Sequence, residues 1–231
     1  MKDISKYDKI PEVEVKQSTG KMSRIVYVAI LSYAFFYTAV NIGQNNSKLL
    51  IQYELGDAFD TAKTASLFSL IISLSRIARI VSNVLFDRLY RKWKDKINII
   101  LTLGLIGAFL LIMIGDFINT NVMLKVQIMA FGFFVILAVR DPFKIYIQDL
   151  ILRVTEPEEQ QAIFAHLELG KKIGTTMMGF VVSIVLLKLS IIWVIIGTVV
   201  ISWMTLKTTI RLFELVKRNR KILRQEKETR I

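Results

Sequence analysis

Three long uncharged runs constrain this 231-residue chain more than any other feature of its sequence. They cover Ile25 to Ser47 with 23 residues, Ile97 to Gly115 with 19, and Leu189 to Leu206 with 18. A helix rises about 1.5 Å per residue, so roughly 20 residues cross the hydrocarbon core of a bilayer, which is ~30 Å thick. Each run is therefore predicted to be a transmembrane helix.

Three further apolar segments have the length of a membrane span but carry charges. They are Thr64 to Phe86, Val126 to Leu152 and Gln160 to Leu187, and the second contains Pro142, where we expect a kink. Including them, we predict an all-α polytopic membrane protein with a bundle of six transmembrane helices over residues 25–206.

Composition excludes several other classes of protein. Hydrophobic residues make up 53% of the chain and charged residues 22%, which argues against a disordered chain and against an ordinary soluble domain. The chain has no Cys and a single His, so disulfide frameworks and thiolate metal sites are excluded and histidine-based catalysis has little support. We therefore expect no enzymatic activity, no metal and no cofactor.

The net charge of +12 lies between the apolar runs and not on a soluble domain, which argues against nucleic-acid binding. Segments 1–24, 87–96, 153–159 and 207–231 hold 21 of the 31 Lys and Arg residues. Because basic residues favour the cytoplasmic side, both termini are predicted to be cytoplasmic and the protein to lie in the cytoplasmic membrane. The first segment would be a tail, and the last a basic helix that either lies on anionic lipid or extends into solvent.

The connection between the second and third predicted helices resembles the signature loop of the major facilitator superfamily. That loop has the pattern Gly-x-Leu-Ala-Asp-Arg-x-Gly-Arg-Lys. Here the sequence reads Asn83-Val84-Leu85-Phe86-Asp87-Arg88-Leu89-Tyr90-Arg91-Lys92. Leu85 and the four charged residues match, whereas Asn83 and Tyr90 replace glycines. The missing glycines are typical of the second-half copy of this loop.

A weaker resemblance follows the fourth predicted helix. Asp149 and the Pro-Glu-rich segment 155–159 are similar to the family's connection between its fourth and fifth helices, although an ordinary polar turn explains them equally well. The family fold has six helices in each half, built from two three-helix repeats, and the two halves enclose a central site. The resemblance therefore implies that this chain is one half, as a fragment, a split-gene product or a dimerising protomer.

The resemblance also implies a gating role for the loop residues Asp87, Arg88, Arg91 and Lys92. In the family, the acidic residue meets the N-terminus of an opposing helix and the basic residues tether the loop in one state. Anchoring of basic residues on the cytoplasmic side explains Arg91 and Lys92 equally well, but it does not explain Asp87.

Charges inside the predicted helices are the candidates for binding a solute or a coupling ion, because such groups usually face a bundle interior or an aqueous path. Arg76 and Arg79 share a helix face, and an anionic solute is indicated if both line the path. Arg140, Asp141 and Lys144 are interpreted either as a self-paired cluster beside Pro142, which we favour slightly, or as a site.

Glu168 and three amide residues complete the candidates. Glu168 is expected to pair with Lys171 and Lys172 on its own helix, the alternative being a proton carrier. Asn41, Gln44 and Asn45 can hydrogen-bond a polar solute or hold helices together. We expect a secondary-transporter half for a small polar or anionic solute; the alternative is a non-transporting fragment or a membrane interaction subunit.

Overall fold

The computed structural model describes residues 19–93, 96–118, 121–155, 157–188 and 191–228, with side chains described except at 19–23, 158, 177–188, 191–193, 195 and 220–228. The described chain folds into six α-helices: α1 (Thr19–Ala58), α2 (Thr61–Trp93), α3 (Ile97–Phe117), α4 (Val122–Leu152), α5 (Pro157–Lys188) and α6 (Ile191–Glu228).

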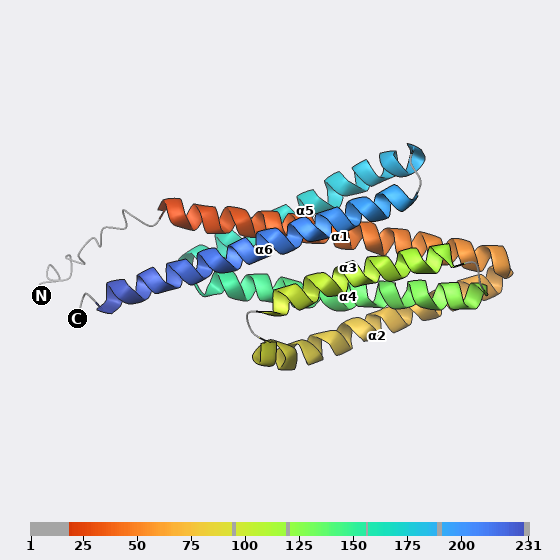
Figure 1. Ribbon diagram of the computed structural model, residues 1–231, viewed down its shortest axis with the longest axis horizontal. Helices are drawn as coiled ribbons and strands as arrows, with labels where there is room; N and C mark the ends of the chain where they lie inside the picture. The colour runs from red at the N-terminus through yellow and green to blue at the C-terminus, as the bar shows by residue number, and fades with distance from the viewer. Residues whose placement is uncertain (1–18, 94–95, 119–120, 156, 189–190, 229–231) are drawn as a thin grey trace, which may run out of the picture.

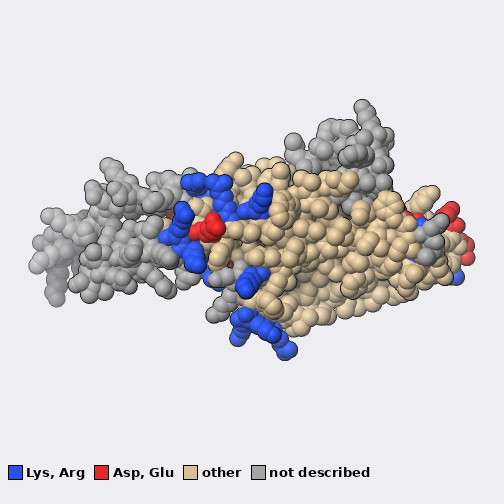
Figure 2. Space-filling model, viewed as in Figure 1, with Lys and Arg blue, Asp and Glu red and all other residues tan. Residues whose placement is uncertain are grey.

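Four of these helices are long and apolar enough to cross a membrane, namely Arg24–Ala58 within α1 and the whole of α2, α3 and α4. The all-helical class and the membrane character predicted from the sequence are confirmed to this extent. Figure 2 agrees, because Lys and Arg gather toward one end of the face shown and a broad band without charge follows. The number of six spans stays a prediction.

Helices α1 and α4 lie at the centre of the bundle. α1 packs against α4, α5 and α6, while α4 packs against α1, α2 and α3, and α3 and α6 pack on each other. In Figure 1, α2 lies at the bottom, and α5 starts below α1 on the left and rises to the top on the right. The start of α1 and the end of α6 lie at the same end of the bundle.

Most of the helix contacts correspond when two three-helix units are exchanged, although the contact of α1 with α2 has no counterpart of similar extent between α4 and α5. The exchange replaces α1 by α4, α2 by α5 and α3 by α6, and the reverse. The contact of α1 with α5 then corresponds to that of α4 with α2. The contact of α1 with α6 corresponds to that of α4 with α3. The pairs α1–α4 and α3–α6 map onto themselves. The amino-acid sequence shows no matching residue-level repeat.

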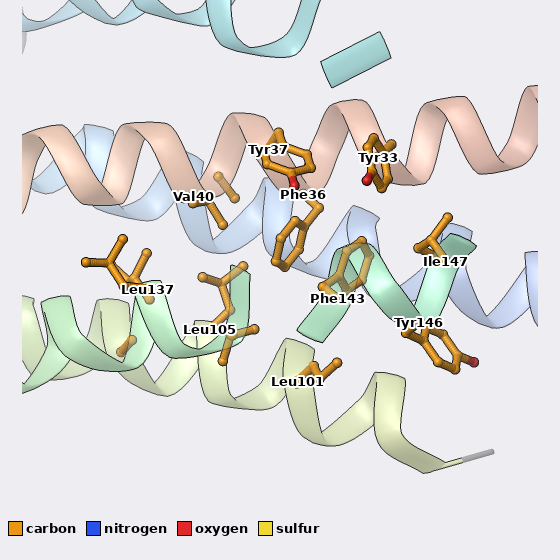
Figure 3. Close-up of a cluster of buried hydrophobic side chains, with 14 of the residues drawn as sticks. Tyr33, Phe36, Tyr37, Val40, Leu101, Leu105, Leu137, Phe143, Tyr146 and Ile147 are labelled. Atoms are coloured by element: carbon orange, nitrogen blue, oxygen red, sulfur yellow. The ribbon is translucent and has the colours of Figure 1, made fainter. Parts of the chain in front are cut away.

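Aromatic rings hold the central pair of helices together. The rings of Phe36 on α1 and Phe143 on α4 are stacked, with centroids 3.7 Å apart (Figure 3). Tyr33 and Tyr37, on the same helix as Phe36, are fully buried, with ring centroids 5.0 Å apart. Because lipid tails are as apolar as the side chains, close packing of this kind is what favours helix association in a membrane.

Glycine lets α5 approach the central helix closely. A Cβ atom at Gly174 would lie 2.6 Å from the backbone oxygen of Ala34 on α1, which is too close for any other residue without a shift of the backbone. At the same place the hydroxyl of Thr38 donates to the carbonyl oxygen of Gly174 over 3.2 Å. Small residues therefore set the spacing of α1 and α5.

Three helices extend well beyond the predicted spans, which corrects the predicted connections. α1 runs from Thr19 to Ala58, where Ile25 to Ser47 was predicted, and α2 and α6 continue past the ends of their apolar runs. α2 continues to Trp93, so Asp87, Arg88, Arg91 and Lys92 form its last turns and not a hairpin loop. Basic residues suit this position because the C-terminal end of a helix carries partial negative charge. α6 likewise continues to Glu228, so the predicted basic segment is helical as far as that residue. Of the predicted N-terminal tail 1–24, residues 19–24 belong to α1 and residues 1–18 lie outside the described part.

Candidate functional site

An ion pair joins α2 to α4 near the middle of α2. Nε of Arg79 donates to Oδ2 of Asp141 over 2.5 Å and Nη2 donates to Oδ1 over 3.0 Å, a bidentate geometry. Nδ2 of Asn83 donates to the same carboxylate over 3.3 Å. The side chains of Arg79 and Asp141 are 44% and 19% exposed, so the pair lies at the edge of the protein and not in its core.

The predicted pairing of Asp141 with Lys144 is wrong. Side chains three residues apart on a helix can reach each other, but these two take partners on different helices. Asp141 meets α2, whereas Nζ of Lys144 donates to Oε1 of Glu168 on α5 over 3.2 Å. The sequence favoured pairing within this cluster. The structure instead shows that the cluster connects α4 to α2 and to α5.

Glu168 lies between two lysines. Its Oε2 accepts from Nζ of Lys171 over 2.6 Å, which confirms the predicted pairing one turn along α5. Lys172 is exposed and makes no ion pair with any residue that the structure describes. The carboxylate of Glu168 thus bridges Lys144 of α4 and Lys171 of its own helix.

Two cations from different helices meet at one tyrosine of α1. The guanidinium carbon of Arg140 lies 5.8 Å from the ring centroid of Tyr37, and Nζ of Lys171 lies 5.4 Å from it. These distances are within the range in which a cation is attracted to an aromatic face. Tyr37 is only 1% exposed, so both cations contact a ring that is buried in the bundle.

Seven charged residues of α2, α4 and α5 lie within helices that were predicted to be spans. We call them the intramembrane charge layer: Arg76, Arg79, Arg140, Asp141, Lys144, Glu168 and Lys171. Arg76 lies one turn from Arg79, is exposed and makes no salt bridge with a described residue. α3 and α6 contribute nothing to the layer, since α3 carries its one charge at Asp116 and the charges of α6 begin at Lys207.

The depth of this layer follows from the length of α2. A helix of 33 residues is about 50 Å long, whereas the hydrocarbon core is ~30 Å thick. Arg79 lies roughly 21 Å from the end of α2 at Trp93. If α2 is centred in a bilayer, Arg79 is therefore about 10 Å inside the hydrocarbon boundary, at a depth where lipid disfavours charge.

The three amide candidates lie apart from these contacts. Asn41 and Gln44 are half-buried and Asn45 is exposed. None of them hydrogen-bonds through its side chain to another residue in the described ranges, and no ion pair or ring contact of the charge layer involves them. The structure therefore places them along α1 beyond Tyr37, without joining them to the charges.

The predicted gating residues lie at the end of α2, where Nη2 of Arg91 meets Oδ2 of Asp87 at 2.9 Å. Both side chains are largely exposed, and Arg88 and Lys92 are exposed as well. Within the described part of the chain, these four residues make no ion pair with another helix. Their exposure is what a contact with a further protein would require.

Tyr90, which stands where the resembling family has glycine, joins the ends of α2 and α4. Its hydroxyl contacts Oδ2 of Asp149, and Nη2 of Arg153 lies 2.5 Å from both of these oxygens. In the sequence, Tyr90 stands out only as a departure from the pattern.

At the opposite end of the bundle, Nζ of Lys125 donates to Oε1 of Glu54 over 3.0 Å, a pair between α4 and α1 that the sequence did not indicate.

Sequence reasoning also missed Tyr33 and Tyr37. Single tyrosines inside an uncharged run resemble ordinary core residues, and only the approach of α4 and α5 shows that cations lie over one of the rings. Their spacing of four residues, which puts both on one helix face, is the signal that was available.

Comparison of the chain with protein-family models, curated proteins and solved structures finds no match. Among the described residues, no group of three or more His, Asp and Glu is placed to hold a metal ion. The chemistry that the charge layer offers is ionic and hydrogen-bonding recognition by guanidinium, ammonium and carboxylate groups.

Proposed function

We propose that this chain is one half of a secondary transporter of the major facilitator type, acting in the cytoplasmic membrane by alternating access on a small polar or anionic solute. The observation that carries the proposal is the intramembrane charge layer. If α2 is centred in a bilayer, Arg79 lies at membrane depth, and side chains of the layer remain partly exposed, including Arg79 at 44% and Lys144 at 36%. Lipid disfavours such charges, so this face requires water, a solute or another protein.

The charges occupy one side of the bundle. They come from α2, α4 and α5 around a ring of α1, whereas α3 and α6 pack together on the other side of the central pair. α2 and α5 flank α1 and α4, and α4 makes an ion pair toward each flank. A second six-helix bundle set against α1, α2, α4 and α5 would enclose the charge layer in a central site.

Two further observations support a transporter half. This class of transporter uses inverted three-helix repeats, and most helix contacts of this chain correspond when two three-helix units are exchanged. The exposed end of α2 carries Asp87 and Arg91, paired with each other and available to an opposing bundle. In the proposed mechanism the two bundles rock about the central site, and the contacts of this helix end stabilise one of the two states.

A reconstitution experiment tests the proposal. The purified chain would be placed in proteoliposomes, alone and with any companion six-helix protein, and uptake of labelled carboxylates, phosphates and sugars measured under imposed proton or sodium gradients. We expect gradient-driven uptake that Glu168→Gln abolishes and Lys172→Gln, its exposed neighbour control, preserves. Absence of gradient-driven uptake of every solute, with and without the companion, would sink the transport claim.

The second candidate is a membrane subunit that binds another membrane protein and transports nothing. The exposed apolar surface of α2, with Arg76 on it, favours this alternative, because a partner helix bearing a carboxylate would cover both features. The mass of the detergent-solubilised protein discriminates. A complex of two six-helix bundles supports a transporter, whereas a larger complex with an unlike membrane protein, combined with no flux, supports the interaction subunit.

A further inference from the structure

Positive charge is in excess within the intramembrane charge layer. The layer contains five cations and two carboxylates. Asp141 is occupied by the bidentate contact of Arg79, and Glu168 is shared by Lys144 and Lys171. Arg76 and Arg140 form no salt bridge with a described residue, and the two lysines share one carboxylate.

Two of these cations meet at Tyr37, one of them paired with Glu168. Arg140 and Lys171 approach the same ring from α4 and α5, at 5.8 Å and 5.4 Å from its centroid. Two like charges attracted to one small ring repel each other, and in a medium of low dielectric constant this repulsion is far stronger than in water. An anion that contacts both cations removes the repulsion and satisfies the donors of the guanidinium and the ammonium.

We infer that Arg140 and Lys171, over the ring of Tyr37, form a binding site for a small oxyanion, a carboxylate or phosphate group of a soluble molecule. This inference rests on the proposed function and specifies its solute class. The guanidinium supplies a planar pair of donors that matches two oxygens of a carboxylate or phosphate. The ammonium supplies a point charge from the facing helix, so the anion would connect α4 to α5.

The position of the site favours a small solute over the other sources of negative charge. The cations lie against a ring that is 1% exposed, on the face that the proposed second bundle would enclose, and in that arrangement a solute reaches them along the path between the bundles. A second copy of this chain would bring the same positive excess. A lipid headgroup lies at the bilayer surface, about 10 Å from this depth.

Anion binding can be measured on the purified full-length chain in neutral detergent. Sodium phosphate, citrate and acetate would be titrated at constant ionic strength, and binding followed by calorimetry and by the rise in unfolding temperature. We expect saturable binding of at least one probe, weakened about tenfold or more in Arg140→Gln and in Lys171→Gln, which corresponds to the loss of one charge-assisted contact. Lys172→Gln, the exposed neighbour, should bind like the unmodified chain.

The conservative variants Arg140→Lys and Lys171→Arg keep the fold and charge and should retain intermediate affinity, so the test holds even if a glutamine variant fails to fold. A parallel titration in nanodiscs with and without phosphatidylglycerol distinguishes a headgroup from a free anion. Three results would each overturn the inference: no saturable binding of any probe; equal weakening in Lys172→Gln; or stabilisation by phosphatidylglycerol alone that Arg140→Gln removes.

The binding and uptake experiments distinguish a failure of the anion site from a failure of the transport proposal. Saturable anion binding that depends on Arg140, in a protein without flux, retains the site and rejects the transporter. Flux of an uncharged solute that is unaffected by Arg140→Gln retains the transporter and rejects the anion site.

Discussion

Helices α1 and α2 are both long and apolar enough to cross a membrane, yet they occupy opposite surroundings. In the most apolar stretch of α1, 61% of residues are buried inside the protein, whereas in that of α2 only 6% are. α1 contacts α4, α5 and α6 closely, while α2 packs mainly on α4 and buries only Ser75 and Phe86. Hydropathy therefore predicts that a helix is shielded from water, but it does not predict whether protein or lipid surrounds the helix.

The two helices are also held in different ways. α1 is held by stacked rings and by the close approach of Gly174, which are packing contacts. α2 is held at Arg79 and Asn83 by the Asp141 carboxylate and at Tyr90 by the end of α4, which are polar contacts. We expect truncation of apolar side chains to damage α1 and loss of polar groups to damage α2.

The largest expected effect comes from the central ring stack. Phe36→Ala should lower the free energy of unfolding by about 3 kcal/mol, because it removes a buried aromatic contact and leaves a cavity. Ile80→Ala on α2, where the side chain is 65% exposed, should change it by no more than about 0.5 kcal/mol. Unfolding of the purified protein by SDS titration in micelles measures both, and equal losses would refute the contrast between the helices.

The close approach of α5 to α1 gives the next largest effect. Gly174→Val should cost about 2 kcal/mol, since its side chain would collide with the backbone oxygen of Ala34. Gly107→Val on α3 is the matched control, because a Cβ there meets nothing within 4 Å, and we expect a change of at most about 0.5 kcal/mol. The same SDS titration measures both variants. An unchanged free energy of unfolding in Gly174→Val would show that α5 packs less closely on α1 than described.

The polar attachment of α2 is tested by Asp141→Asn. Loss of this carboxylate should cost about 1.5 kcal/mol, between the values typical of exposed and of buried pairs. Arg91→Gln breaks an Arg–Asp pair on the same helix that is 79% and 64% exposed, and should cost under about 0.5 kcal/mol. A double variant with Arg79→Gln should lose less than the two single changes together, and simple additivity would argue against the pair.

A smaller effect is expected where the end of α2 meets α4. Tyr90→Phe removes only the hydroxyl that contacts Asp149 and should cost about 1 kcal/mol. Tyr53→Phe, on a side chain that is 72% exposed, should leave the unfolding curve unchanged. An unchanged Tyr90→Phe protein would mean that α2 is held by the Arg79 pair alone.

The positions of the helices could be predicted from the sequence because apolar runs follow the thickness of a bilayer. The predicted start at Ile97 and the predicted end at Leu152 coincide with the ends of α3 and α4. The end of α2 was misplaced, since a helix does not stop where its apolar run stops. Residues 87–92 contain no Pro or Gly, and the backbone hydrogen bonds continue in water as they do in lipid.

The candidate charges could be selected from the sequence, but their partners mostly could not. Glu168 and Lys171 are three residues apart on one helix, so helical spacing indicates their contact. Arg79 and Asp141 are separated by 62 positions, and their contact depends on how α2 and α4 are aligned along the bundle. That alignment comes from packing, which the spacing of charges along one helix does not reveal.

In the proposed transporter the face with the charge layer meets water, whereas the outer face of α3 meets lipid. The chain has no Cys, so single cysteines can be introduced without a further change. Arg76→Cys and Leu110→Cys are both exposed at membrane depth, on α2 and α3 respectively, and would be treated in intact membranes with a charged, thiol-specific methanethiosulfonate. We predict modification at position 76 and none at position 110. Equal reactivity at the two positions, or modification at position 110 alone, would contradict this prediction.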